Sequence, residues 1–580
     1  MGPHPDTPDR FRRFVAGPAG PGPRRFVAGL IPPWRRPFHP FIVAGGLSWG
    51  GPGKARCTPS GTILERQGTV LAQLTSAALK GVESYLVRVE VHIGRGLPAF
   101  SVVGLAEGAV REGRERVWAA LQNSGFSVPP NKITVNLAPA DVRKEGSAFD
   151  LPLALGLLAG LGEIPGDALP GMAFVGELGL DGSLRPIPGV MSMAEACRQG
   201  GLGDLVVPEP NAPEGAVLGG LAVRGARTLR QVVRHLRGEE EIPPLELDAG
   251  SLLEEDGSPG PDMGEVRGQE HVKRALEVVA AGGHNILLLG PPGSGKTMLA
   301  RRLPGILPPM TLEEAVEVTC VHSVAGLLGP GQPLLRARPF RAPHHTVSEG
   351  GLVGGGGVPR PGEASLAHHG VLFLDELPEF RRNVLEALRQ PLEDGHVVIS
   401  RARTSLRFPS GFVLVAAMNP CPCGFFGDGS DRCTCDPSQV SRYRARISGP
   451  LLDRVDLHVS VRRVPFQAMA RHEWEEETPS ILERVRRARA RQSERFRAEK
   501  GVHCNGQMGV REIRRHCRPS AQVASMLQRA MDRLALSARA YHRILKVART
   551  VADLAGSGEI GPLHVSEAIQ YRALDRATPL

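Results

Sequence analysis

A phosphate-binding pattern near the middle of this 580-residue chain constrains its fold more than any other feature. Residues 286–289 (Ile-Leu-Leu-Leu) predict a short buried strand, and residues 290–297 continue as a complete G-x-x-x-x-G-K-T loop that opens a helix. Glycines in such a loop let backbone N–H groups and the helix N-terminus approach anionic oxygens. We therefore expect a nucleoside triphosphate to be bound by Gly290, Pro291, Pro292, Gly293, Ser294, Gly295, Lys296 and Thr297.

Two side chains of this loop and two acids downstream predict the chemistry of the site. Lys296 can reach the β and γ phosphates, and the Thr297 hydroxyl can hold Mg²⁺. Residues 371–376 (Val-Leu-Phe-Leu-Asp-Glu) predict a buried strand that ends in acids, with Asp375 beside the Mg²⁺ and Glu376 able to polarise an attacking water. A surface acidic pair is the alternative, which the four buried-type residues before it disfavour. The sequence thus predicts hydrolysis of ATP with Mg²⁺.

The net charge of +10 is concentrated at one end of the chain. Residues 1–68 hold ten Lys and Arg against three Asp and Glu, so +7 of the total lies there. This segment is rich in Pro, Gly and Arg without any period, which predicts disorder; a basic arm and an upstream extension from a misassigned start codon are both open. Nucleic-acid binding must therefore be argued from local clusters of charge. Because no signal-peptide pattern and no apolar run of about eighteen residues occurs, we expect a cytoplasmic protein without a membrane partner.

An α/β pattern in the first half of the chain carries a resemblance of its own. Residues 144–150 (Lys-Glu-Gly-Ser-Ala-Phe-Asp) and 186–190 (Pro-Ile-Pro-Gly-Val) resemble the Lon-protease-type domain, in which a Ser and a Lys form the catalytic dyad. In this sequence the serine position of that family falls on Ala148, and the lysine position falls on Met191, whose thioether cannot act as a base. The resemblance therefore implies a non-proteolytic scaffold, with Ser147 as a cap or turn residue.

Two polar residues farther along the chain resemble auxiliary site residues of AAA+ ATPases. Asn419 follows the apolar strand 411–417, as does sensor 1, which hydrogen-bonds the γ-phosphate or the lytic water in that family. Arg539 lies in the first turn of a helix for which Ser537 is a candidate N-cap. It resembles the sensor 2 arginine, which touches the γ-phosphate of the same subunit, and Arg543 is the second candidate.

A third residue, Arg454, resembles the arginine that these ATPases project into the nucleotide of the neighbouring subunit. It lies within residues 448–456 (Ser-Gly-Pro-Leu-Leu-Asp-Arg-Val-Asp). A planar guanidinium suits the charge that develops on transferring phosphoryl oxygens. The alternative is an ion pair with Asp453 or Asp456.

Several long strings match one branch of these ATPases. They are residues 340–346 (Phe-Arg-Ala-Pro-His-His-Thr), 350–357, 419–424 (Asn-Pro-Cys-Pro-Cys-Gly) and 536–543. Through them the chain resembles the ComM-type, magnesium-chelatase-like AAA+ ATPases over most of its length. The resemblance implies an α/β fold with an AAA+ P-loop core and a C-terminal helical lid. It also implies a homo-oligomeric ring, a hexamer, that promotes DNA branch migration while transforming DNA is integrated.

Composition and motifs together divide the chain into five expected segments. These are a disordered basic extension (1–68), a Lon-protease-like domain (69–240), a linker (241–264), the AAA+ core (265–465) and a helical lid (466–580).

Two insertions in the core are candidates for contact with DNA. Residues 347–370 are glycine-rich and predict a mobile loop, and residues 395–407 alternate like a hairpin that carries Arg401, Arg403 and Arg407. In a ring such loops face the pore, where arginines can follow the phosphate backbone of single-stranded or branched DNA without reading its sequence. A solvated basic hairpin is the alternative.

Four cysteines stand close together in the sequence at Cys421, Cys423, Cys433 and Cys435. Their thiolates can close a tetrahedral Zn²⁺ site beside Asn419, although the C-x-C spacing differs from the commoner C-x-x-C. Four reduced thiols without a metal are the alternative.

Two classes of function remain open from the sequence. The first is an ATP-driven DNA motor, which the family resemblance and the basic hairpin favour. The second is a non-DNA remodelling ATPase of the magnesium-chelatase type. A complete chelatase is disfavoured because the chain lacks a D-x-S-x-S metal-adhesion segment.

Overall fold

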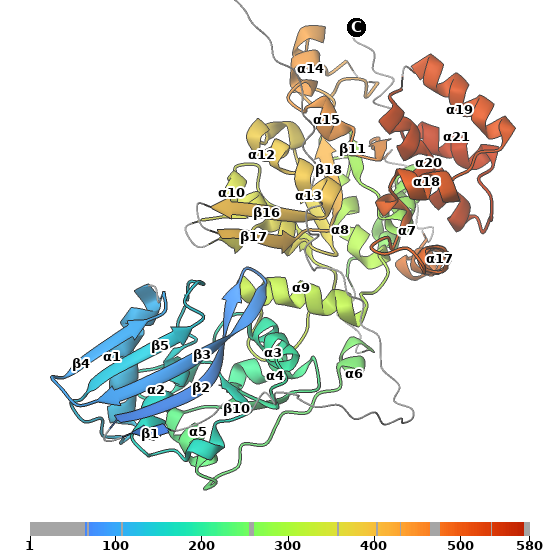
Figure 1. The fold of residues 1–580 in the computed structure, drawn as a ribbon. Coiled ribbons are helices and arrows are strands. Elements are labelled where there is room, and N and C mark those ends of the chain that lie inside the picture. The colour runs from blue at the N-terminus through green and yellow to red at the C-terminus, as the bar shows by residue number, and fades with distance from the viewer. Residues whose placement is uncertain are drawn as a thin grey trace, which may run out of the picture. The chain divides into compact units, whose positions relative to one another are not determined.

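The computed structural model describes residues 64–66, 69–105, 108–144, 146–254, 260–356, 359–401, 404–429, 431–464, 476–534 and 536–572. Figure 1 shows their helices and strands in chain order. The expected basic extension lies almost entirely outside the described residues, as does Arg403.

The first part of the chain is built on a mixed sheet around one long antiparallel pair. Strands β2 (Thr69–Lys80) and β3 (Glu83–Gly94) pair over their whole length, and the sheet runs β10-β9-β6-β2-β3-β5-β4. Apolar residues alternate along β3, so that Val87, Val89 and Val91 are buried while their neighbours are not. The other strands are β1 (Leu64–Arg66), β4 (Ala99–Val103), β5 (Lys132–Ala138), β6 (Met172–Phe174), β9 (Asp204–Pro208) and β10 (Ala222–Ala226).

Helices cover both faces of this sheet. Helix α2 (Asp150–Gly160) is buried along its whole length and packs in one core with Val89 and Val91, whereas α3 (Val190–Gln199) packs in a second core with Ala77 of the opposite face. A Cβ at Gly156 of α2 would meet Val91 at 2.6 Å, so only glycine allows this approach of helix to sheet. The remaining elements are α1 (Gly108–Asn123), the hairpin β7 (Glu177–Leu178) and β8 (Leu184–Arg185), α4 (Ala212–Ala216), α5 (Leu229–Leu236) and α6 (Ala249–Glu254).

The second part contains a five-stranded sheet in which every pair of strands is parallel. Its order is β12-β15-β18-β11-β19, formed by β11 (Ile286–Leu289), β12 (Phe340–Arg341), β15 (Val371–Leu374), β18 (Val413–Met418) and β19 (Leu457–Ser460). Helices α7 (Glu270–Gly282), α8 (Lys296–Ile306) and α9 (Leu312–Val324) lie between these strands or just before them in the sequence. Parallel sheets are normally covered on both faces, which explains why their strands are continuous apolar runs.

Successive residues of these strands pack into two different cores. Ile286, Val371 and Val415 belong to the core that includes α7 and α8, and their neighbours Leu287 and Leu372 belong to the other one. The second core also takes in α10 (Glu349–Val353), α12 (Arg382–Ala387) and residues near α15 (Gly449–Leu452). The sheet is therefore the middle layer of three.

The C-terminal part is helical, as expected. It consists of α17 (Thr478–Phe496), α18 (Val510–His516), α19 (Ala521–Leu534), α20 (Ala538–Leu554) and α21 (Pro562–Gln570), shown in orange and red in Figure 1. Ser537 caps α20, since its hydroxyl accepts the N–H of Ala540 at 3.2 Å. The arginine-rich α17 buries one face against α7 and α20, and Arg495 pairs with the buried Asp553.

The two insertions fold into small elements. Residues 347–370 form α10, α11 (Glu363–Leu366) and the short pair β13 (Gly354–Gly355) and β14 (Arg360–Pro361), rather than the loop without a core pattern that was expected. Leu352 and Ala364 are fully buried in the core beside β15 and anchor this segment. Strands β16 (His396–Arg401) and β17 (Thr404–Pro409) form the predicted hairpin, preceded by α13 (Arg389–Asp394). Among the described helices, none has the length and apolar character needed to cross a membrane.

Candidate functional site

The three predicted nucleotide motifs lie at one edge of the parallel sheet. The phosphate loop follows β11, the acids Asp375 and Glu376 follow β15, and Asn419 follows β18. Strands β15, β18 and β11 are neighbours and point the same way, so their carboxyl ends meet at this edge. Ligands of open α/β sheets bind at such an edge.

The phosphate loop is shaped by its glycines. A Cβ at Gly290 would meet the carbonyl oxygen of Val461 at 2.2 Å, so any larger residue would push the loop off the end of the sheet. Gly293 and Gly295 have φ of 72° and 89°, a left-handed conformation that favours glycine. Helix α8 begins directly afterwards at Lys296, which turns its N-terminus toward the loop. This is the shape that a phosphate group requires.

The ammonium group of Lys296 is held at the loop by three uncharged acceptors. Its Nζ donates to the carbonyl oxygens of Gly290 at 2.7 Å and Pro291 at 3.0 Å, and to Oδ1 of Asn419 at 3.1 Å. Burial lowers the pKa of Lys296, while the charges of Asp375 and Glu376 act in the opposite direction. An anionic phosphate oxygen would be a stronger partner for this ammonium than any of its present acceptors.

The two predicted Mg²⁺ ligands are already in contact. The hydroxyl of Thr297 donates to Oδ2 of Asp375 at 2.7 Å. Glu376 stands next to them with φ of 51°, an uncommon conformation for a residue other than glycine, and its side chain is 56% exposed. Oxygen ligands of this kind suit Mg²⁺, and a strained, accessible carboxylate suits contact with water.

Two residues of the site were missed by the sequence analysis. Gln269 also has a positive φ, of 66°, and its amide donates to the carbonyl oxygens of Ser294 and Arg462 at 3.0 and 2.8 Å, which ties the start of α7 to the phosphate loop. Nδ1 of His345 lies 3.8 Å from Oε2 of Glu376. His345 stands in a string that matched the family, but nothing in the local pattern of either residue indicates these contacts.

Arg454 is buried and has a different partner from those expected. Its side chain forms an ion pair with Glu393, and its NH1 donates to the carbonyl oxygen of Pro450 at 2.6 Å. The alternative of a pair with Asp453 or Asp456 is therefore wrong, because those acids face Arg539 and Arg543 instead. Nε of Arg454 has no hydrogen-bond partner among the described atoms.

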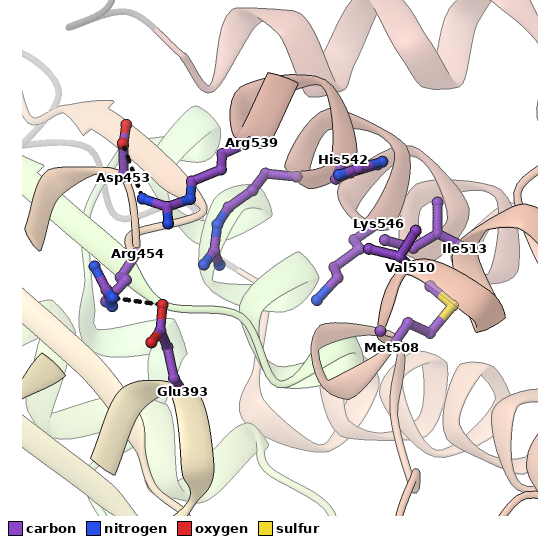
Figure 2. A pocket seen from close by; sticks show the side chains of 11 residues that line it. Glu393, Asp453, Arg454, Met508, Val510, Ile513, Arg539, His542 and Lys546 are labelled. Carbon is purple, nitrogen blue, oxygen red and sulfur yellow. Dashed lines mark ion pairs between the residues drawn. The ribbon is translucent and has the colours of Figure 1, made fainter. Parts of the chain in front are cut away.

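Arg454 and Arg539 line one cavity between the parallel-sheet part and the helical part (Figure 2). The cavity has a volume of about 170 Å³, and NH1 of Arg539 lies 3.9 Å from Asp453 at its rim. It is rich in cationic side chains, and its lining consists of Glu393, Asp453, Arg454, Met508, Gly509, Val510, Ile513, Arg539, His542, Arg543 and Lys546. Within the described part of the chain no residue of the phosphate loop lines it, so Arg539 is grouped with Arg454 rather than with Lys296.

Arg543, the second candidate for sensor 2, serves a structural contact. It pairs with the buried Asp456, which also accepts the N–H of Asn285 at 3.0 Å. Burial alone would raise the pKa of Asp456, but Arg543 and His284 lower it below its usual value. This arrangement fixes α20 to the start of β11, whereas Arg539 on the same helix stays largely exposed.

The hairpin of β16 and β17 has one buried face. Val397, Ile399, Leu406 and Phe408 form a small core with Val82 and Val353, so the hairpin is not a freely solvated ribbon. Arg407 lies on the other face and its guanidinium meets Nδ1 of His396 at 3.0 Å. Arg401 is the last residue of β16. Its side chain and the whole of Arg403 are not among the parts of the chain that the structure describes. Their role in binding DNA stays a prediction.

The four predicted metal-binding cysteines converge. All four Sγ atoms lie within 4.8 Å of one another, with Cys421 to Cys433 at 3.8 Å, Cys423 to Cys433 at 3.7 Å and Cys421 to Cys423 at 3.3 Å; the fourth is Cys435. The N–H of Phe426 points at the sulfur of Cys421 at 3.3 Å. The sequence spacing alone did not establish that two C-x-C pairs could meet in this way.

The Lon-like part has no catalytic dyad among its described residues. Ala148 and Met191 are buried, and Lys144 is fully buried with its ammonium donating to the carbonyl oxygen of Pro139. The hydroxyl of Ser147 donates to Glu177, and its carbonyl accepts the N–H of Asp150, so Ser147 lies in a turn as expected. The Lys144 ammonium is thus engaged elsewhere and does not activate this serine.

Comparison with known proteins gives the family of the chain. Family models described as magnesium chelatase subunit ChlI, as subunit ChlI of Mg-chelatase and as the ChlI C-terminal region match residues 262–469, 89–211 and 475–572. The chain is 46% identical over 513 residues to the competence protein ComM of Haemophilus influenzae, an alignment that covers 87% of this chain and 98% of that protein. It belongs to the ComM-type, magnesium-chelatase-like AAA+ family. The YifB protein of Escherichia coli is 44% identical over 505 residues, or 87% and 97% of the two chains.

Membership of this AAA+ family implies an ATPase that uses ATP and Mg²⁺. The expected α/β fold, with a P-loop core followed by a helical part, is confirmed. Relatives named for the chelatase itself are more distant. The magnesium-chelatase 38 kDa subunit of Rhodobacter capsulatus is 30% identical over 172 residues, which is 26% of this chain and 48% of that subunit.

Proposed function

We propose that the protein is a ring-forming, ATP-driven DNA motor, a hexamer that promotes branch migration in homologous recombination and natural transformation. The observation that carries this proposal is the 46% identity across almost the full length of a protein named for competence. Competence is the state in which cells take up DNA, so a motor that serves it is expected to act on DNA.

Hydrolysis is assigned to the residues at the edge of the parallel sheet. The loop 290–297 binds the phosphates, with Lys296 on the β and γ groups, and Thr297 and Asp375 hold Mg²⁺, which neutralises phosphate charge. Glu376 polarises the attacking water and Asn419 orients it or the γ-phosphate. The hydrogen bonds of Thr297 with Asp375 and of Lys296 with Asn419 support this assignment, since they bring the four groups within reach of one ligand.

Arg454 and Arg539 are both assigned to the nucleotide of the neighbouring subunit. An arginine that acts across an interface must lie away from its own phosphate loop, and the described residues that line the cavity shared by these two side chains include none from that loop. This assignment replaces the expectation that Arg539 acts within its own subunit. It also makes the ring a requirement for hydrolysis.

The hairpin is assigned to the DNA backbone. Its buried apolar face fixes it to the rest of the protein, and its other face carries Arg407. Arg401 is the last residue of β16, and Arg403 lies between the two strands in the sequence. Cations on an anchored hairpin suit sequence-independent contact with phosphates.

The four cysteines are assigned to a structural Zn²⁺ ion. With Zn–S bonds of about 2.3 Å, two sulfurs of a regular tetrahedron are about 3.8 Å apart. The distances of Cys433 to Cys421 and Cys423, 3.8 and 3.7 Å, fit this value, and a fourth thiol lies within range. Elemental analysis of protein purified without chelator should give one zinc per chain, and a metal-free protein would exclude the site.

A second candidate is a non-DNA remodelling ATPase of the chelatase type. The observation that favours it is that the matching family models, over all three parts of the chain, are named for a chelatase subunit. Both candidates use the same ATP site and differ in what the ring acts on.

The experiment that separates them is the rate of ATP hydrolysis with and without DNA. We expect forked, four-way and single-stranded DNA to stimulate the rate, and Glu376→Gln to remove both basal and stimulated turnover. Hydrolysis that no DNA stimulates would contradict the motor proposal and favour the remodeller.

A further inference from the structure

The four-cysteine loop is in direct contact with the ATP site. It begins immediately after Asn419, whose Oδ1 accepts from Lys296, and Cys421 two residues later is fully buried. It ends at Cys435, next to Asp436, which caps α14 (Pro437–Arg444) by accepting the N–H of Gln439 at 2.8 Å. One bound ion would therefore fasten both ends of the loop, one at the site and the other on a helix.

The middle of the loop packs on the phosphate loop itself. Gly424 has φ of 89°, and a Cβ at this position would meet Cδ and Cγ of the Pro292 ring at 2.5 and 2.7 Å. A proline ring cannot turn away as a flexible side chain can, so the two loops are in rigid contact. Pro292 is one of the residues of the phosphate-binding pattern.

The same loop is fastened on its outer side to α14. Nε of Arg444 donates to the carbonyl oxygen of Pro420 at 3.3 Å, and its guanidinium lies 5.5 Å from the ring centre of Phe426. The N–H of Phe426 in turn meets the sulfur of Cys421. The cysteines are thus the centre of a small unit that reaches toward the nucleotide through Asn419 and Gly424.

We propose that this loop, closed by Zn²⁺, is a strut that positions Asn419 and the phosphate loop for hydrolysis. The inference rests on the proposed zinc site and on the ATP site, and it assigns to the metal a role in turnover beyond folding of its own loop. The residues of the strut are positioning residues, because they act through Asn419 and Pro292 and do not touch the nucleotide. Without the ion, the four cysteines no longer bind a common metal, and the loop between Asn419 and α14 would be released.

The first test removes the metal and restores it. Protein is stripped of zinc with a chelator, the chelator is dialysed away, and ATPase is measured in excess Mg²⁺ before and after addition of ZnCl₂. A displacement of about 1 Å in a catalytic group can cost about 100-fold in rate. We therefore expect kcat to fall by about 10- to 100-fold with little change in KM for ATP, and to recover with Zn²⁺ but not with more Mg²⁺.

The second test uses a matched pair of glycines within the loop. Gly424→Ala places a methyl group against Pro292, whereas Gly427→Ala introduces the same left-handed strain, with φ of 74°, where nothing lies within 4 Å. Both variants should keep one zinc per chain. We expect kcat to fall about tenfold or more in Gly424→Ala and to stay near wild type in Gly427→Ala.

The outcomes distinguish a failure of the strut from a failure of the zinc site or of the ATP site, on which the strut rests. Absence of zinc in the purified protein would overturn the zinc site and the strut together, and a holoprotein without ATPase would overturn the ATP site. Zinc that can be removed from a folded protein without loss of kcat would overturn the strut alone. Equal activity of the two alanine variants would also contradict it, since of these two glycines Gly424 is the one that touches Pro292.

Discussion

At the scale of single residues, the ATP site depends on contacts between segments far apart in the chain. Lys296 meets Asn419, and Thr297 meets Asp375, at distances of 3.1 and 2.7 Å. In the proposed assignment each residue has a separate role: Lys296 binds phosphate, and Glu376, which is exposed and has a positive φ, polarises the attacking water.

Lys296→Ala and Glu376→Gln should consequently fail in different ways. The lysine variant loses its phosphate contact and should not bind a fluorescent ATP analogue. The glutamine variant keeps every phosphate contact but cannot polarise water, so it should bind ATP and retain it unhydrolysed. Normal turnover by Glu376→Gln would contradict the assignment.

The two candidates for the sensor 2 arginine, Arg539 and Arg543, should also differ. Arg543→Ala leaves the buried Asp456 without its ion-pair partner, which costs about 3–5 kcal/mol for such a pair, so the melting temperature should fall by several degrees. Arg539 is 65% exposed and its removal should leave the melting temperature unchanged while abolishing ATPase. Thermal melts and ATPase rates of both variants check this. An Arg543→Ala variant that is stable but inactive would mean that Arg543, and not Arg539, serves hydrolysis.

At the scale of elements, we expect the hairpin to bind DNA, and we expect the Lon-like part to have no proteolytic activity. Arg401 is the last residue of β16, and the buried face of the hairpin consists of Val397, Ile399, Leu406 and Phe408. The Lon-like part has Ala148 and Met191, both buried, at the two positions of the expected catalytic dyad.

Replacing Arg401 and Arg403 together by Ala should weaken binding to all DNA sequences about equally and reduce its salt dependence, because phosphate contacts carry no base information. Fluorescence anisotropy at several salt concentrations measures both effects. Basal ATPase should survive. Loss of hydrolysis with unchanged DNA affinity would mean that the hairpin is structural.

The protein should leave unfolded casein intact in the presence of ATP. Ala148 and Met191 replace the dyad, and Ser147 donates to Glu177 without a lysine to activate it. Gel electrophoresis over several hours checks this. Cleavage that disappears in Ser147→Ala would overturn the scaffold interpretation.

Elements whose signal is local could be predicted from the sequence. The strand and loop at 286–297, the acids after 371–374 and the Ser537 cap depend on neighbouring residues, and each appears where its pattern indicated. Contacts between distant segments could not be predicted. Glu393 is 61 positions from Arg454 along the numbering. Gln269 meets the phosphate loop, and His345 meets Glu376, only because folding brings these distant segments together. The buried Leu352 anchors a glycine-rich segment that composition alone had suggested was a loop.

At the scale of the whole molecule, the proposed function requires a ring in which each ATP site is completed by a neighbour. Mixing Arg454→Ala protein with Lys296→Ala protein should restore part of the ATPase, because some interfaces then combine an intact phosphate loop with an intact arginine. Neither variant should hydrolyse well alone. Failure to restore any activity, with mixed rings verified by size, would contradict an action of Arg454 across the interface.

A second mixture tests where Arg539 acts. If Arg454 and Arg539 reach the same neighbouring nucleotide, every interface in a mixture of Arg454→Ala and Arg539→Ala proteins lacks one of the two arginines, and activity should stay low. If Arg539 acts within its own subunit, some interfaces are complete and activity should return. Steady-state ATPase of the mixture therefore distinguishes the two arrangements.

The most direct test of the DNA motor is movement of a DNA branch by the purified protein. A labelled four-way junction is incubated with protein, ATP and Mg²⁺, and the products are resolved by native electrophoresis. We expect the junction to be converted to forked products only when ATP is present, and not by Glu376→Gln. An active ATPase that binds the junction and leaves its branch point in place would contradict the proposal of a DNA motor.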